Sequence, residues 1–159
     1  MRMSIVFRWL VSTVHVFILF AATAAGQESF GLGLMVGEPT GFSGKVWHDD
    51  VMAFDGGLAW SFSDETDISV HGDVLWHNWR VLAEALDVTR DAQLPLYYGI
   101  GGRLKAGDDA RFGVRFVLGA SLMFDEAPFD VFFEMAPIMD IVPDTTLRAH
   151  AALGCRFWF

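Results

Sequence analysis

The first residues that could carry out chemistry lie at alternate positions of one predicted strand, residues 68–79. One face of this strand carries Ser69, His71, Asp73 and His77, because successive side chains of a strand point to opposite faces. A histidine beside a carboxylate and a hydroxyl can activate a nucleophile. Each step of two residues along the strand covers about 6.6 Å, so a proton relay would need partners from other strands. We therefore interpret them as part of a polar interior and predict no catalytic residue.

Two further arrangements could be reactive or could bind a metal. His150 and Glu134 are expected on adjacent strands, and the same interpretation applies to them. His71, Asp73 and His77 could offer metal ligands, but the two histidines lie six residues, or about 20 Å, apart along a strand. The compact ligand spacing of a zinc site is missing, and no cysteine joins them. The sequence therefore predicts no metal site and no cofactor.

Charged residues recur on the same face in most of the predicted strands. Counting back from the turn at residues 48–50 places Lys45 opposite Asp55, or nearly so, where opposite charges attract. Counting from the turns at 125–128 and 143–144 places Glu134 close in height to inward arginines. An unpaired charge is costly in a narrow interior. We therefore predict an ionic network in the lumen that contains Lys45, Asp55, Asp73, Arg103, Arg115, Glu134 and Arg156.

The elements that would position these charges are eight segments in which the side chains alternate. The last one, residues 147–159, is the clearest, because its odd positions are all apolar and its even positions carry two arginines and a histidine. The preceding seven segments are residues 30–36, 41–47, 52–62, 68–79, 94–105, 111–122 and 129–140. The connection at residues 81–93 fits either a short helix or a loop.

Eight short alternating segments separated by turn residues predict an all-β fold. We expect an eight-stranded antiparallel up-and-down transmembrane β-barrel after a cleaved N-terminal signal peptide. A soluble barrel of lipocalin type has an apolar interior and a polar outer face. Here one face of the strands is almost free of charge, and the other carries charges in most strands, Arg148 included, which a soluble core could not pack cheaply. A lipid-facing exterior with a polar interior accommodates both faces better. An eight-stranded barrel is only wide enough for its own side chains, so we predict a plugged lumen, filled by Trp47, Arg103, Arg115, Phe132, Arg156 and Trp158.

The composition limits the class of protein. The chain has 159 residues, enough for one domain, and is 53% hydrophobic and 19% charged, which is too apolar for a disordered chain. Residues 1–26 combine Arg2 and Arg8 with an apolar stretch and a small-residue end, which predicts a secretory signal peptide and leaves residues 27–159 for the barrel. Removing both arginines leaves nine basic residues against 20 acidic ones, which argues against a nucleic-acid partner. The single cysteine, Cys155, cannot form an internal disulfide.

Several short motifs resemble a known family. They are the Gly37-Glu38-Pro39-Thr40-Gly41 turn, the Pro95-Leu96-Tyr97-Tyr98-Gly99 strand, the Arg111-Phe112-Gly113-Val114-Arg115 segment, the Pro143-Asp144-Thr145 turn and the aromatic terminus. On these residues the chain resembles small bacterial outer-membrane β-barrel proteins. These include the OmpA/OmpX-type eight-stranded barrels and an uncharacterised group of "outer membrane protein beta-barrel" sequences.

The resemblance implies a location and partners but no activity. It implies a monomer in the bacterial outer membrane, surrounded by outer-membrane lipid. It also implies an assembly signal at Phe157 and Phe159 that the barrel-assembly machinery reads during insertion. With both termini periplasmic, the long connection at residues 81–93 would lie on the periplasmic side, which differs from the long outer loops of better known small barrels.

We therefore expect a small integral outer-membrane β-barrel with a structural or accessory role and no catalysis. One alternative is a lipid-modifying outer-membrane barrel enzyme, a lipid A hydrolase or acyltransferase, built on the histidines of the polar face. A third is a secreted soluble barrel that binds a ligand.

Overall fold

The computed structural model describes residues 30–38, 40–61, 67–86, 92–106 and 110–159. The predicted signal peptide, residues 1–26, lies outside the described residues.

Eight long strands account for most of the described chain, and they correspond to the eight alternating segments of the sequence. A helix of six residues, α2 (Val81–Leu86), and a two-residue strand, β5 (Ala92–Gln93), lie between the fourth and fifth long strands. The connection that fitted either a helix or a loop therefore begins as a helix. The long strands are β1 (Phe30–Glu38), β2 (Thr40–Trp47), β3 (Met52–Ser61), β4 (Asp67–Asn78), β6 (Leu96–Ala106), β7 (Arg111–Phe124), β8 (Phe129–Val142) and β9 (Thr146–Trp158).

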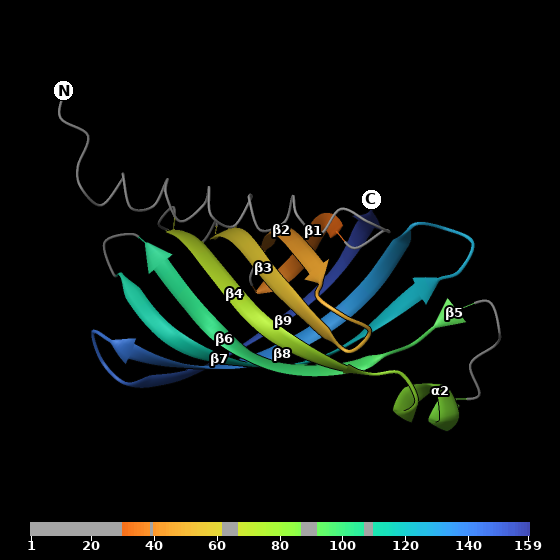
Figure 1. The fold of residues 1–159 in the computed structure, drawn as a ribbon. Coiled ribbons are helices and arrows are strands. Elements are labelled where there is room, and N and C mark those ends of the chain that lie inside the picture. The colour runs from red at the N-terminus through yellow and green to blue at the C-terminus, as the bar shows by residue number, and fades with distance from the viewer. Residues whose placement is uncertain (1–29, 39, 62–66, 87–91, 107–109) are drawn as a thin grey trace.

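The strands form a closed antiparallel barrel (Figure 1). Each long strand pairs with the next one along the chain, and β9 returns to pair with β1. At this seam the backbone nitrogen of Phe159 donates a hydrogen bond of 2.9 Å to the carbonyl oxygen of Phe30. The short β5 pairs with the end of β7. The predicted eight-stranded up-and-down barrel is therefore confirmed.

The two ends of the barrel are distinct. Phe30 and Phe159 lie at the same end as α2, and we call this the terminal end. The opposite end carries the connections between β1 and β2 and between β8 and β9, and we call it the loop end. Within the described residues, no helix is long and apolar enough to span a membrane.

The polarity of the barrel is inverted relative to a soluble protein. Arg115 and Arg156 point inward and are each only 1% exposed, whereas Phe116 and Leu153 point outward and are 48% and 58% exposed. Strand β8 alternates between buried and exposed residues from Phe129 to Asp140. The period-two pattern of the sequence thus divides the side chains between a charged interior and an apolar outer surface.

Inward glycines make room for large side chains on the neighbouring strand. A Cβ atom on Gly119 would collide with the ring of Tyr97, which lies directly opposite in the register of β6 and β7. A Cβ atom would collide in the same way between Gly57 and His71 and between Gly154 and Phe132, and one on Gly31 would lie in tight contact, 3.1 Å, with the Trp158 ring. Large and small residues therefore alternate around the narrow interior, which lets the large ones fill it.

The turn between β2 and β3, at the terminal end, is held by one carboxylate. Asp49 Oδ1 accepts hydrogen bonds of 2.8 Å from the backbone nitrogens of both Val51 and Met52. These two backbone donors lower the pKa of Asp49 from its usual value, because they stabilise the ionised form.

Candidate functional site in the barrel interior

Among the described residues, three clusters of ion pairs lie in the interior, stacked along the barrel axis. Each is centred on an arginine whose guanidinium group contacts more than one partner. From the terminal end to the loop end, the central residues are Arg156 on β9, Arg115 on β7 and Arg103 on β6.

The Arg156 cluster lies nearest the terminal end. Arg156 Nη1 is 2.6 Å from Asp55 Oδ2, and its Nε is 3.2 Å from Asp130 Oδ1. Asp130 is directly opposite Arg156 on β8, whereas Asp55 reaches it from β3 on the far side of the lumen. The guanidinium carbon also lies 3.9 Å from the centre of the Phe132 ring, a cation–π contact.

Lys45 lies beside this cluster and has a different partner from the one predicted. The register of β2 and β3 does place Lys45 directly opposite Asp55. Its Nζ nevertheless lies 2.7 Å from His77 Nε2 and within 5 Å of the rings of Trp47 and Tyr97. His77 Nδ1 is 3.0 Å from the Val51 carbonyl oxygen, which can only accept, so Nδ1 carries the hydrogen and Nε2 accepts from Lys45.

The Arg115 cluster occupies the middle of the barrel. Arg115 Nη2 is 2.5 Å from Glu134 Oε1, and Arg115 Nε is 3.2 Å from Asp73 Oδ2. The Tyr97 hydroxyl donates a longer hydrogen bond of 3.4 Å to Glu134 Oε2. Gly101 lies in β6 between Asp73 and Arg115 in the register, and a Cβ atom there would collide with the Asp73 carboxylate. Because Gly101 has no side chain, Asp73 on β4 and Arg115 on β7 can meet on the inner side of β6.

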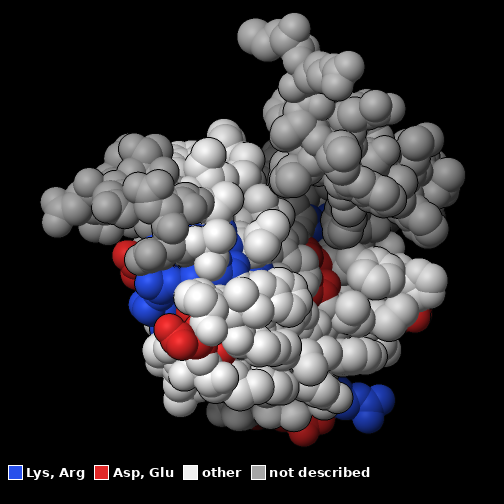
Figure 2. All heavy atoms as spheres, turned by 90° about the vertical axis from the view of Figure 1, so that its left-hand side faces the viewer, with Lys and Arg blue, Asp and Glu red and all other residues white. Residues whose placement is uncertain are grey.

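The Arg103 cluster lies toward the loop end. Arg103 Nη2 is 3.1 Å from Asp140 Oδ1, and Nη1 is 3.0 Å from His150 Nε2. Arg148 Nε is 3.1 Å from the other oxygen of Asp140, with a side chain that is 43% exposed. Figure 2 views the barrel from this end and shows lysine and arginine side chains gathered there, with acidic side chains beside them.

All seven residues of the predicted network are buried, but the ion pairs among them join only Asp55, Asp73, Arg115, Glu134 and Arg156, whereas Lys45 and Arg103 contact residues outside the predicted set. Glu134 meets an inward arginine, Asp73 meets the same arginine, and Asp55 meets Arg156. Two acidic members, Asp130 and Asp140, were missing from the predicted network although both are almost fully buried. Both lie at even-numbered positions of β8, as Glu134 does, so the alternation of side chains along the strand could have identified them as inward-pointing.

The predicted assembly residues lie apart from these clusters. Phe157 and Phe159 are 48% and 65% exposed on the outer surface, and their ring centres are 5.0 Å apart. Their role in assembly stays a prediction.

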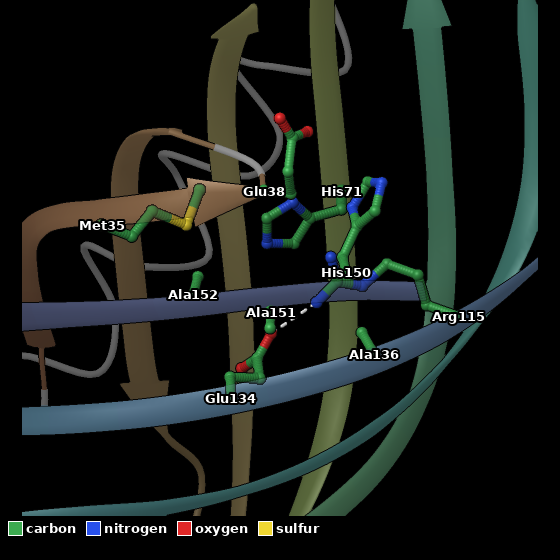
Figure 3. A pocket seen from close by; sticks show the side chains of 9 residues that line it. All are labelled: Met35, Glu38, His71, Arg115, Glu134, Ala136, His150, Ala151 and Ala152. Atoms are coloured by element: carbon green, nitrogen blue, oxygen red, sulfur yellow. Dashed lines mark hydrogen bonds and ion pairs between the residues drawn. The ribbon is translucent and has the colours of Figure 1, made fainter. Parts of the chain in front are cut away.

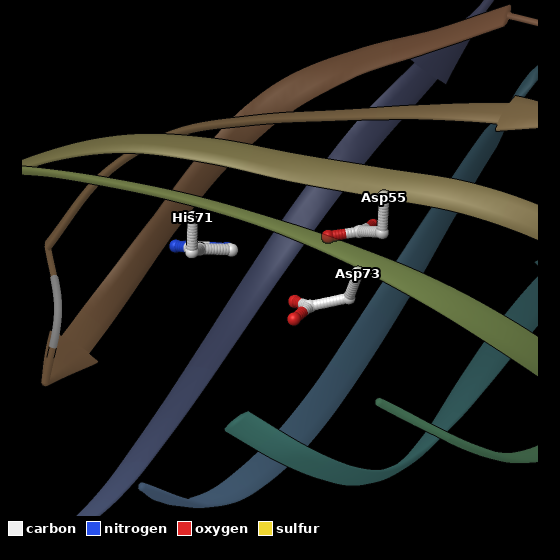
Figure 4. A group of neighbouring side chains, drawn as sticks. All are labelled: Asp55, His71 and Asp73. Atoms are coloured by element: carbon white, nitrogen blue, oxygen red, sulfur yellow. The ribbon is translucent and has the colours of Figure 1, made fainter. Parts of the chain in front are cut away.

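The possible catalytic set does not form a relay within the described residues. His71 Nδ1 is buried without a hydrogen-bond partner, and His77 is engaged with Lys45 near the terminal end. Ser69 and His71 form no hydrogen bond with each other in this part of the chain. The residue that instead approaches His71 and Asp73 is Asp55 from β3 (Figure 4).

A small pocket opens beside the Arg115 cluster. It has room for about 10 Å³, roughly one water molecule. Figure 3 shows Arg115, Glu134 and two histidines converging on it from four strands. Its lining consists of Met35, Glu38, His71, Arg115, Glu134, Ala136, His150, Ala151 and Ala152.

Comparison with known proteins supports the fold. No protein-family model matches this sequence, and none of the curated proteins matches it. Among solved structures, the N-terminal β-barrel domain of OprF from Pseudomonas aeruginosa is similar, with a TM-score of 0.54 and 15% sequence identity. The similarity covers 84% of this chain and 99% of the OprF chain. It confirms the expected likeness to a small eight-stranded barrel and, at this identity, shows the fold alone.

Proposed function

We propose that this protein is a small integral outer-membrane β-barrel with a plugged polar lumen, and that its role is structural or accessory. The observation that carries the proposal is the inverted polarity of the barrel. A soluble protein rarely exposes a large contiguous apolar surface, because water disfavours it. Here the exposed apolar side chains come from every long strand and include Leu34, Phe42, Leu58, Val70, Ile100, Phe116, Phe133 and Leu153.

Aromatic pairs near both ends of the barrel support a membrane-spanning position. Phe42 and Trp60 pack together toward the loop end, with ring centres 5.5 Å apart. Trp76 and Tyr98 stack toward the terminal end, with ring centres 6.1 Å apart. Membrane barrels carry such aromatic residues at the two membrane interfaces, with the apolar band between them.

The packing of the interior supports a plugged lumen. The Arg156 guanidinium lies against the Phe132 ring, and Lys45 lies between Trp47 and Tyr97. Eight-stranded barrels are just wide enough for their side chains to fill. We therefore expect no diffusion of ions or small solutes through the barrel.

Two experiments test the proposal. Fractionation of Gram-negative cells that express the full chain should recover the mature protein in the outer membrane, soluble only with detergent. Recovery in the soluble fraction without detergent would contradict the membrane location. The purified barrel in planar lipid bilayers should give no steady conductance above that of the lipid, and a stable conductance step would contradict the plugged lumen.

The absence of catalysis is part of the same proposal. Lipid A from cells with and without the protein should have the same mass. A mass difference that corresponds to a lost or gained acyl chain, and that disappears in a His71→Gln variant, would favour the lipid-modifying alternative.

A further inference from the structure

Two carboxylates face each other directly in the middle of the barrel. The register of β3 and β4 pairs Asp55 with Asp73, and both side chains are more than 95% buried. Like charges directly opposite each other on neighbouring strands are destabilising. Arg156 beside Asp55 and Arg115 beside Asp73 supply positive charge at one oxygen of each carboxylate, and a cation between the two carboxylates would reduce their repulsion further.

A buried histidine completes the group. Ligand atoms of Asp55, His71 and Asp73 all lie within 4.8 Å of one another. Figure 4 shows both carboxylates extending toward the side of the lumen where His71 lies. His71 Nδ1 and Asp73 Oδ1 are both buried and have no hydrogen-bond partner. Buried polar atoms are rarely left unpaired, which points to an additional partner at this place.

We propose that Asp55, His71 and Asp73 bind a divalent transition-metal ion of the Zn²⁺ type inside the barrel. One imidazole nitrogen and two carboxylate oxygens are a ligand set that zinc accepts. Three protein ligands leave one coordination position open. The water-sized pocket that His71 also lines lies beside this group and offers a place for a water ligand.

The distances require a small contraction around the ion. Zinc ligands lie about 2.0–2.2 Å from the ion, so the ligand atoms of a tetrahedral site are about 3.4 Å apart. Compared with the 4.8 Å limit found here, closing the site needs movements of roughly 1 Å, within the reach of side-chain rotation.

The neighbouring arginines do not need to leave when an ion binds. Arg156 contacts Asp55 and also Asp130, and Arg115 contacts Asp73 and also Glu134. Each arginine thus keeps one carboxylate partner if Asp55 and Asp73 turn toward an ion. Both arginine contacts are made to Oδ2 of an aspartate, and contacts of this kind from the surroundings commonly orient metal ligands.

The test uses the full mature chain without an affinity tag, refolded in detergent. Equilibrium dialysis against Zn²⁺ alone should give about one bound ion per chain. The His71→Gln variant should lower the affinity by about 100-fold or more, because the only nitrogen ligand is lost. The matched control is His48→Gln, which changes an exposed histidine of the β2–β3 turn and should bind as the unmodified chain does.

A second measurement keeps the test decisive if the His71 variant does not fold. Titration of the unmodified chain with Co²⁺ should produce visible absorption bands of a protein-bound ion, and these bands should disappear when Zn²⁺ is added. Failure to bind either ion at millimolar concentration overturns the proposal. Equal loss of binding in the His48 variant also overturns it, because the ion would then lie on the turn.

Discussion

Replacing Glu134 by glutamine tests whether the interior of the barrel is held by paired charges. The substitution keeps the size of the side chain and removes one negative charge. In the structure, Glu134 is within 2.5 Å of Arg115 and is buried between β7 and β9. The variant therefore changes the charge of the central cluster with almost no change in packing.

The expected loss in the free energy of unfolding depends on the contacts that Arg115 and the new glutamine keep in the variant. Removing one member of a buried ion pair typically costs about 3–5 kcal/mol, because the other charge is left uncompensated. Arg115 keeps Asp73 at 3.2 Å, and glutamine can still accept a hydrogen bond through its carbonyl oxygen. The cost should therefore approach that of a hydrogen bond to a charged group, about 1.5–3 kcal/mol. We expect the free energy of unfolding of the variant to fall by roughly 2–3 kcal/mol.

The assay is urea unfolding of the refolded barrel in lipid vesicles, followed by tryptophan fluorescence. The midpoint should decrease while the slope with denaturant stays constant, because the two proteins expose the same surface on unfolding. Glu126→Gln is the matched control, since it makes the same chemical change at an exposed residue of the β7–β8 turn. Surface substitutions of this kind usually change stability by less than about 0.5 kcal/mol.

Unfolding of both glutamine variants at the same urea concentration would refute a stabilising role for the Glu134 charge. Such a result would mean that the Glu134 charge contributes nothing beyond its packing. Combining Glu134→Gln with Arg115→Met measures the interaction between these two residues. If they interact, the losses in the free energy of unfolding from the two substitutions should be non-additive.

The remaining predictions concern the outer surface, the end of the chain, the interior glycines and one turn. Phe116→Arg should destabilise the barrel in lipid by about 2–4 kcal/mol near the middle of the membrane, measured by the same unfolding assay; no loss would indicate that this face does not meet lipid. Deletion of Phe159 should reduce insertion in cells but leave refolding in detergent unchanged, so equal insertion would contradict an assembly signal. Gly119→Ala should cost about 1–3 kcal/mol because its Cβ atom meets an aromatic ring on the neighbouring strand. Gly44→Ala, whose nearest neighbour is 3.4 Å away, should be tolerated. The stabilisation by Asp49 should be present at neutral pH and be lost as the pH falls through its depressed pKa, so an Asp49→Asn variant should differ from the unmodified chain only above that pH.

The strands and their two faces were predictable because they depend on local sequence. Alternation with a period of two assigns each side chain to a face without knowledge of its neighbours in space. The apolar outer residues Phe54, Val70 and Leu153 and the inward Arg115 and Glu134 all follow from this rule. The ends of strands were less predictable, because β7 and β8 continue two residues beyond the predicted segments.

The partners of the inward charges were predictable only where they are close in the chain. Counting from a short turn gave the Lys45–Asp55 register, yet the long lysine side chain reaches His77 on β4 instead. Contact between Arg156 and Asp55 joins residues 101 positions apart across the lumen, and no turn length relates them. Side-chain reach across a closed barrel therefore limits what the sequence alone can assign.

Some of the ion pairs join strands that are not neighbours in the sheet. Arg156 joins β9 to β3, and the other two arginines join strands that are separated by one strand in the sheet. Those two ion pairs cross above inward glycines, Gly101 in β6 and Gly113 in β7. In a soluble barrel, a hydrophobic core would hold opposite walls together.

A barrel with lipid outside has no such driving force, because lipid tails are as apolar as its outer side chains. Charged contacts across the lumen replace that core in the proposed membrane-spanning barrel. The same side chains that brace the walls also fill the space between them. Substitutions that open the lumen should therefore lower stability at the same time, and conductance and unfolding free energy should change together in any variant of the three arginine clusters.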